Sequence, residues 1–192
     1  MSYDELIELI QTYTIRTDIP VEMLMRLAEA SLRPIAKHYL AEKTVTLTVT
    51  DEIAELPTDL LEIRAITGAI GKIYKPISPV ATELYDGEIG YYRVGDSISF
   101  VPHSASTVDA QVTLLYRYSF PNLTDTQSNW LFERFPNIYV RAILKEANRW
   151  LKDAEGVATE DAALKEELGI LAEDDRDGRK TGPIYWSPSA WQ

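Results

Sequence analysis

The sequence contains no cysteine in its 192 residues. This absence excludes a disulfide framework, a thiol nucleophile and a metal site built on thiolates. Histidine is nearly absent too, and we interpret His38 and His103 as unrelated surface residues, because they lie far apart in the sequence. No apolar run approaches the roughly 18 residues of a membrane span, and the acidic, amphipathic start is unlike a signal peptide. We therefore expect no membrane partner, and a cytoplasmic or virion location.

Motifs that carry chemistry are also missing. The sequence has no phosphate loop, no glycine-rich dinucleotide turn and no Gly-x-Ser-x-Gly elbow. The acidic run from Glu173 to Gly178 is only superficially like a calcium loop, because Arg176 interrupts it and Ile184 stands where the last acidic ligand belongs. We interpret this run as a solvated helix end. The sequence therefore predicts no cofactor, no metal site and no enzymatic activity.

The charge is strongly unbalanced, with a formal net charge of −11. Tight binding to a phosphate backbone requires clustered lysine and arginine, so this balance argues against it. An acidic surface repels DNA, which would let a double strand pass nearby without specific binding.

Helical signals dominate the first forty residues. Ser2 and Glu5 have the spacing of a capping box, and the first helix is predicted to end near Thr14. Asp18 is the predicted cap of a second helix, which Pro34 should kink or end. Apolar residues repeat through this second helix at helical spacing: Met23, Leu24, Leu27, Ala30 and Leu32.

Strand signals follow. Residues 44–50 alternate threonine with apolar residues, and Gly95-Asp96 joins two short runs as a hairpin loop. Further strands are expected at 61–66, 72–74 and 112–118, with a helical turn at 78–85. These patterns predict a small antiparallel β region of about five strands, inserted at residues 44–122.

The long amphipathic helix at 137–153 is the element on which the rest depends. Pro136 suits its first turn, and its wide apolar face extends from Ile138 to Trp150 and Leu151. Gly156 should interrupt the chain before a final helix that starts near Thr159. The predicted fold class is α+β: a mainly α-helical body of about four helices, drawn from 1–43 and 123–178 within one domain (1–182), with the small β region inserted.

A basic stripe lies opposite the apolar face of the long helix, at helical spacing: Arg141, Lys145, Arg149 and Lys152. It could contact DNA, which would make the protein an acidic DNA-packaging or nucleic-acid-binding accessory factor. Alternatively, the acidic final helix or a neighbouring subunit neutralises it. The acidity of the whole chain favours neutralisation.

The C-terminal segment 183–192 is aromatic without any periodicity. Its large apolar residues, which would be costly to leave in water, are Ile184, Tyr185, Trp186 and Trp191. The segment either covers its own core or is an arm donated to a partner. Pro183 and Pro188 favour an extended arm.

One stretch resembles a known family. The strand ending in YRYSFPNLTD leads into NWLFERFPNIYVRAILKEANRWLKD, whose motif positions are Asn129, Trp130, Leu131, Pro136, Tyr139, Ala142, Ala147, Trp150 and Asp153. Similar segments are SYDELIELIQ, AEASLRP, LPTDLLEIRAI and YYRVGDSISFVP. With these segments the sequence resembles the head-to-tail adaptor proteins of tailed bacteriophages, also called connector or head-completion proteins.

The resemblance implies a structural virion protein at the neck, made in the host cytoplasm. It implies a ring of about twelve copies under the portal, which extends the DNA channel and provides the platform for tail attachment. The implied partners are the portal protein, tail or nozzle proteins and other copies of the chain. It also implies that a C-terminal arm, with Ile184, Tyr185, Trp186 and Trp191, docks on the portal.

Overall fold

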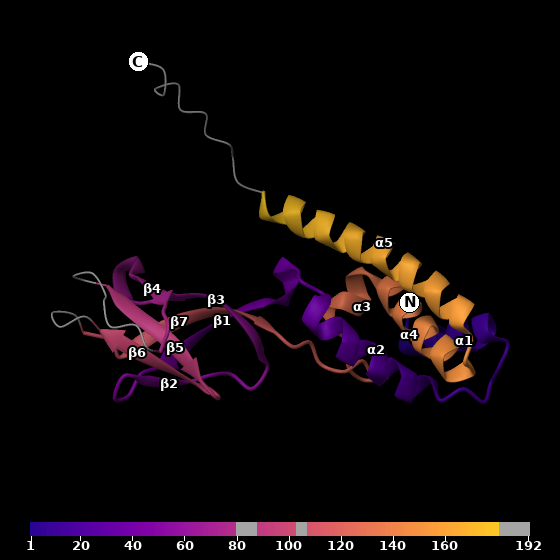
Figure 1. Ribbon diagram of the computed structural model, residues 1–192, viewed down its shortest axis with the longest axis horizontal. Helices are drawn as coiled ribbons and strands as arrows, with labels where there is room; N and C mark the ends of the chain where they lie inside the picture. Colours follow the sequence, from indigo (N-terminus) through magenta and orange to yellow (C-terminus); the bar gives the residue numbers. More distant parts are fainter. Residues whose placement is uncertain (80–87, 103–106, 181–192) are drawn as a thin grey trace, which may run out of the picture. The chain divides into compact units, whose positions relative to one another are not determined.

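The computed structural model describes residues 1–79, 88–102 and 107–180, and this part of the chain contains five α-helices and seven β-strands (Figure 1). The chain divides into two compact units. The helical unit combines Met1–Leu40 with the residues from Pro121 onward, and the sheet unit is Ala41–Phe120. None of the described helices is both long and apolar enough to span a bilayer.

The first helix has the predicted start and end. Helix α1 extends over Tyr3–Thr14, and the capping box is confirmed: the Ser2 hydroxyl accepts the Glu5 N–H at 3.1 Å, and the Glu5 carboxylate accepts the Ser2 N–H at 2.7 Å. The chain leaves the helix through Ile15, whose φ of 53° is left-handed.

The predicted cap of the second helix is wrong. Helix α2 extends over Val21–Ile35 and has Pro20 at its N-cap. Arg16 instead donates two hydrogen bonds to the Asp18 carboxylate, at 2.8 and 2.6 Å, so this side chain is occupied before the helix begins. Pro34 lies in the last turn of α2, and the helix ends one residue later.

The remaining helices are α3 at Trp130–Arg134, α4 at Pro136–Leu151 and α5 at Ala154–Arg179. Pro136 occupies the first turn of α4, as predicted. The predicted start of the last helix is wrong, because Asp153 caps α5 by accepting the Gly156 N–H at 3.0 Å. Gly156 therefore lies inside the first turn of α5, and the α4–α5 connection is shorter than expected.

Helix α4 lies between α2 and α5 in the helical unit (Figure 1). Tyr139 of α4 contacts Glu29 of α2, whereas Arg141 of α4 contacts Glu160 of α5. Tyr139 and Arg141 are two residues apart, which is roughly 200° around a helix. The helices α2 and α5 therefore cover opposite sides of α4.

The sheet unit contains one seven-stranded sheet. Its strands are β1 (Glu42–Thr48), β2 (Ile53–Glu55), β3 (Leu60–Thr67), β4 (Ile73–Pro76), β5 (Ile89–Val94), β6 (Ser97–Pro102) and β7 (Gln111–Tyr118). Their order is β1-β7-β3-β4-β5-β6-β2. All pairs are antiparallel except β4 with β5. The predicted hairpin at Gly95-Asp96 is confirmed, and Gly95 supplies the positive φ of 58° that its turn needs.

The two edges of this sheet come back together. Strands β1 and β2 are neighbours in sequence but occupy opposite edges of the sheet, and a bridge between Thr50 and Ile53 joins them through a tight turn. Asp51 and Glu52 in that turn both have positive φ. The sheet is therefore a nearly closed, barrel-like structure.

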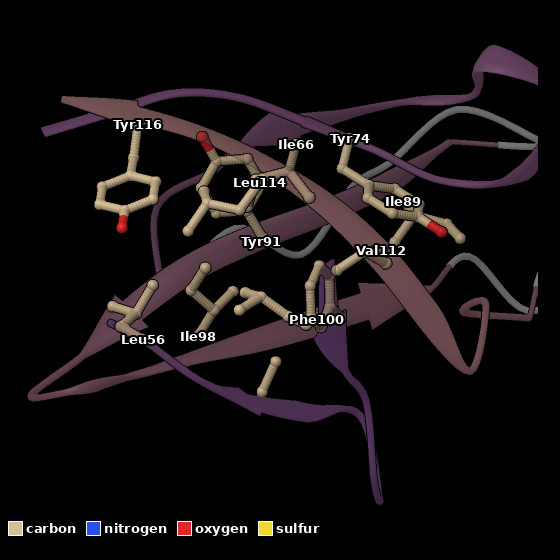
Figure 2. Packing of buried hydrophobic residues seen from close by; sticks show 12 residues of the cluster. Leu56, Ile66, Tyr74, Ile89, Tyr91, Ile98, Phe100, Val112, Leu114 and Tyr116 are labelled. Carbon is tan, nitrogen blue, oxygen red and sulfur yellow. The ribbon is translucent and has the colours of Figure 1, made fainter. Parts of the chain in front are cut away.

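A continuous apolar core fills the sheet unit. Figure 2 shows side chains from several strands converging inside the curved sheet, among them Ile66, Tyr74, Phe100 and Leu114, each almost completely buried. Tyr74 and Phe100 pack edge to face with ring centroids 5.4 Å apart.

The predicted fold class is therefore wrong, because it underestimated the β structure relative to the helices. We expected a mainly helical body with a small antiparallel region of about five strands. The described residues instead form a seven-stranded, nearly closed sheet that includes a parallel pair. One reason is that a short strand such as Ile53–Glu55 carries a weak local signal and is fixed by its long-range partner β6. The helical turn expected at 78–85 lies largely outside the described residues.

Candidate assembly surfaces

The basic stripe of α4 lies partly against α5. The Arg141 guanidinium is 3.3 Å from the Glu160 carboxylate, and the Lys145 ammonium donates to Asp161. Lys145, followed by Lys165, lowers the pKa of the Asp161 carboxyl to about 2. Two cations of the stripe therefore form ion pairs inside the helical unit rather than facing outward.

The other two cations of the stripe lie at the C-terminal end of α4. Arg149 donates to Glu146 at 2.7 Å, and Lys152 is exposed in a left-handed conformation with φ of 61°. Since three of the four cations contact carboxylates of the same chain, this geometry gives little support to a DNA-binding stripe.

The family-motif residues form the centre of the helical unit, with one exception. Trp130 and Tyr139 are buried, and Pro136 begins α4. Trp150 was expected on the buried face, but it is 41% exposed, and the Arg16 guanidinium lies over its ring at 5.5 Å.

A buried polar network connects α2 to α4 and to the segment before α3. The Oε1 atom of Glu29 accepts the Tyr139 hydroxyl at 3.1 Å and the Leu123 N–H at 2.7 Å. The Asn129 amide donates to the Tyr139 oxygen at 2.7 Å and to the Pro121 carbonyl at 3.0 Å. Burial raises the pKa of Glu29. Nothing in the sequence pairs Glu29 with Tyr139, so this network was not predicted.

His38 is buried, which contradicts its interpretation as a surface residue. Its Nδ1 accepts the Leu40 N–H at 3.2 Å, and its Nε2 lies 2.9 Å from the Asp174 carboxylate. Arg134, followed by His38, lowers the pKa of Asp174. These contacts hold the C-terminal part of α5 against the segment that follows α2. The contact could not be found from the sequence, since the two residues are 136 positions apart. His103 lies outside the described residues.

The acidic helix end at 173–178 is held by contacts of this kind. Asp175 accepts the Tyr39 N–H at 2.6 Å and pairs with Arg179. Among the residues that the structure describes, no group of three or more metal-ligating side chains occurs.

Helices α2 and α5 each have one face that points away from α4 and is exposed in the described part of the helical unit. The side of α2 that points away from α4 exposes an apolar row, which we call the α2 outer stripe: Met23, Leu27, Ala30 and Pro34. Met23 is 49% exposed and Leu27 is 51% exposed. The side of α5 that points away from α4 exposes the α5 outer stripe: Ala162, Glu166, Gly169, Ile170, Glu173 and Asp177. The predicted arm residues Ile184, Tyr185, Trp186 and Trp191 lie outside the described part of the chain.

The described residues thus present large, dissimilar helix faces on opposite sides of a packed unit. Such faces are typical of structural proteins that act by binding other proteins. Comparison with known families agrees, since the model of the SU10 adaptor protein family matches residues 1–186. The chain therefore belongs to this family of phage head-to-tail adaptors. A comparison with curated proteins gave no match.

The resemblance drawn from the sequence is confirmed by this match. It makes the chain a bacteriophage adaptor and a component of the virion. Family membership also favours a structural role over catalysis.

Proposed function

We propose that the chain assembles as a ring of about twelve copies under the portal, extends the DNA channel and provides the platform for tail attachment. Membership of the SU10 adaptor protein family along residues 1–186 is the observation that carries this proposal. A closed ring requires two different contact surfaces on each copy. The dissimilar outer stripes of α2 and α5 support the proposal, because they lie on opposite sides of one unit.

The charge of the chain supports the passage of DNA without specific binding. The net charge is −11, and an acidic lumen would repel the phosphate backbone. Arg141 and Lys145, which could otherwise attract DNA, are paired with carboxylates of α5.

The proposed partners are the portal protein above the ring and tail or nozzle proteins below it. The C-terminal arm is the proposed portal-docking segment. Its aromatic residues are suited to anchoring in pockets of a partner, because each would bury a large apolar area on binding.

The test is binding to an isolated portal ring, followed by imaging of the complex. The full chain should form a collar on the ring, and a chain ending at residue 182 should lose portal binding while keeping its circular dichroism spectrum. A second variant of full length, in which Tyr185, Trp186 and Trp191 are replaced by serine, should lose binding to a similar extent. Replacing the exposed Tyr13 by serine is the matched control. A full chain that never binds the portal would refute the proposed function.

A further inference from the structure

The α2 outer stripe is an apolar helix face that no described element of the helical unit covers. At roughly 100° per residue, its four members fall within a sector of roughly 60°, directly opposite the buried residues of α2. Isolated apolar residues on a surface are ordinary, but a row of them on one helix face indicates an interface. A hollow of about 360 Å³ beside Met23, lined in part by Ile7 and Ile19, continues the apolar surface toward α1.

We propose that the α2 outer stripe of one copy docks on the α5 outer stripe of the next copy. This inference rests on the proposed ring and assigns its subunit contact. The two stripes belong to the same helical unit and lie on opposite sides of α4. A copy therefore offers one stripe to each neighbour, which is the head-to-tail arrangement that a ring needs.

Charge complementarity favours α5 of the next copy as the partner of the α2 outer stripe. Arg26, which is exposed, borders the α2 outer stripe on one side. The α5 outer stripe carries Glu166 and Glu173, both exposed, one on each side of Gly169. Opposite charges on facing surfaces favour this pairing and disfavour the contact of α5 with another α5.

Side-chain size is complementary too. The α2 outer stripe offers Met23 and Leu27, whereas the α5 outer stripe offers Ala162 and Gly169, so large side chains can enter gaps between small ones. Gly169 is otherwise unexplained, because a Cβ added there would meet no atom within 4 Å. A glycine inside a helix lowers its stability. Close approach of a neighbouring helix accounts for its presence.

The absence of cysteine makes a cross-linking test direct. The full chain with Leu27→Cys and Ala162→Cys is treated with a short bismaleimide, both free at high concentration and bound to a portal ring whose own thiols are blocked. We expect a ladder of dimers, trimers and higher multiples of the 21.7 kDa chain on a denaturing gel. Each single variant should give no ladder, since it carries a thiol on only one of the two surfaces.

The outcomes separate this inference from the function on which it rests. Portal binding by the double variant without a ladder would overturn the subunit contact alone. Dimers from Leu27→Cys by itself would indicate a symmetric contact between two α2 outer stripes, and this would overturn the inference. A wild-type chain that does not bind the portal would instead contradict the proposed function.

Charge reversal supplies the second test. Arg26→Glu and Glu173→Arg should each weaken assembly about tenfold, and combining them should restore it in part. Asp96→Arg, an equal change of charge at an exposed position in the sheet unit, should leave assembly unchanged. Assembly that is unaffected by both Arg26→Glu and Glu173→Arg would contradict the assigned contact.

Discussion

The Tyr139 hydroxyl lies 3.1 Å from the Oε1 atom of Glu29, and both side chains are fully buried. The same oxygen accepts the Leu123 N–H, and the Arg33 guanidinium lies 3.6 Å from the other oxygen of this carboxylate. A buried carboxylate is stable only when hydrogen bonds replace its water. This pair therefore connects α2, α4 and the segment at Leu123 in one network.

Replacing Tyr139 by phenylalanine should destabilise the helical unit by about 1–3 kcal/mol, because Glu29 and Asn129 each lose a buried partner. Denaturant unfolding followed by tryptophan fluorescence measures this, since none of the four tryptophans lies in the sheet unit. Tyr13→Phe, at a residue that is 59% exposed, should change the free energy of unfolding by less than about 0.5 kcal/mol. Equal effects of the two substitutions would refute this role of the network.

Glu29 should make the stability of the helical unit depend on pH. Burial raises its pKa above the ordinary value of 4.5, so the folded state binds the proton more tightly than the unfolded state. The resulting stabilisation is complete below pH 4.5 and is lost as the pH rises through the raised pKa. In Glu29→Gln, which keeps an oxygen acceptor for Leu123 and Tyr139, this loss should be absent. The measurement is the free energy of unfolding of both chains from pH 4 to 7. A constant difference between them across that range would contradict the prediction.

Local signals predicted several features of both units correctly. The capping box at Ser2 and Glu5, the position of Pro136 and the hairpin at Gly95-Asp96 each depend on residues close in sequence, and all are observed. The start of α5 was misplaced because glycine usually weakens helices, whereas Gly156 donates to the Asp153 cap.

Long-range pairing could not be predicted in the same way. The strand order of the sheet requires β1 to pair with β7, which places Thr46 opposite Thr113, and no local pattern encodes that register. The contact of His38 with Asp174 is equally remote in sequence. In α2, apolar residues occupy two sides of the helix, so the spacing alone could not tell the exposed Met23 and Leu27 from the buried face.

Protonation of Asp161 at low pH should weaken the packing of α4 on α5. The ammonium groups of Lys145 and Lys165 lower its pKa from the ordinary value of 3.8 to about 2. A lowered pKa stabilises the fold above pH 3.8, and this contribution is lost as the pH falls through about 2. Asp161→Asn should therefore lose less stability than the wild type between pH 4 and pH 2. Acid unfolding followed by tryptophan fluorescence measures the difference, with Asp96→Asn in the sheet unit as the control. Identical acid unfolding of Asp161→Asn and the wild type would contradict this prediction.

Two of the three glycines of α5, Gly156 and Gly169, provide a matched pair of substitutions with opposite expected effects on stability. A Cβ at Gly169 would meet no atom within 4 Å, so Gly169→Ala should stabilise the isolated chain by about 0.5–1 kcal/mol, as alanine does in a helix interior. A Cβ at Gly156 would lie 2.4 Å from the Asp153 carboxylate and 2.7 Å from the Asn148 amide, so Gly156→Ala should destabilise it.

Thermal unfolding of the free chains measures both glycine effects. If the α2 outer stripe docks over Gly169, the bulkier Gly169→Met should leave the free chain folded and weaken ring assembly, because its side chain would fill the space that Met23 or Leu27 of the next copy occupies. The matched exposed control is Ala172→Met, which is also on α5 but lies about 60° around the helix from Gly169 and outside the α5 outer stripe. Assembly that tolerates methionine equally at both positions would show that no helix approaches Gly169 closely, and the glycine would then need another explanation.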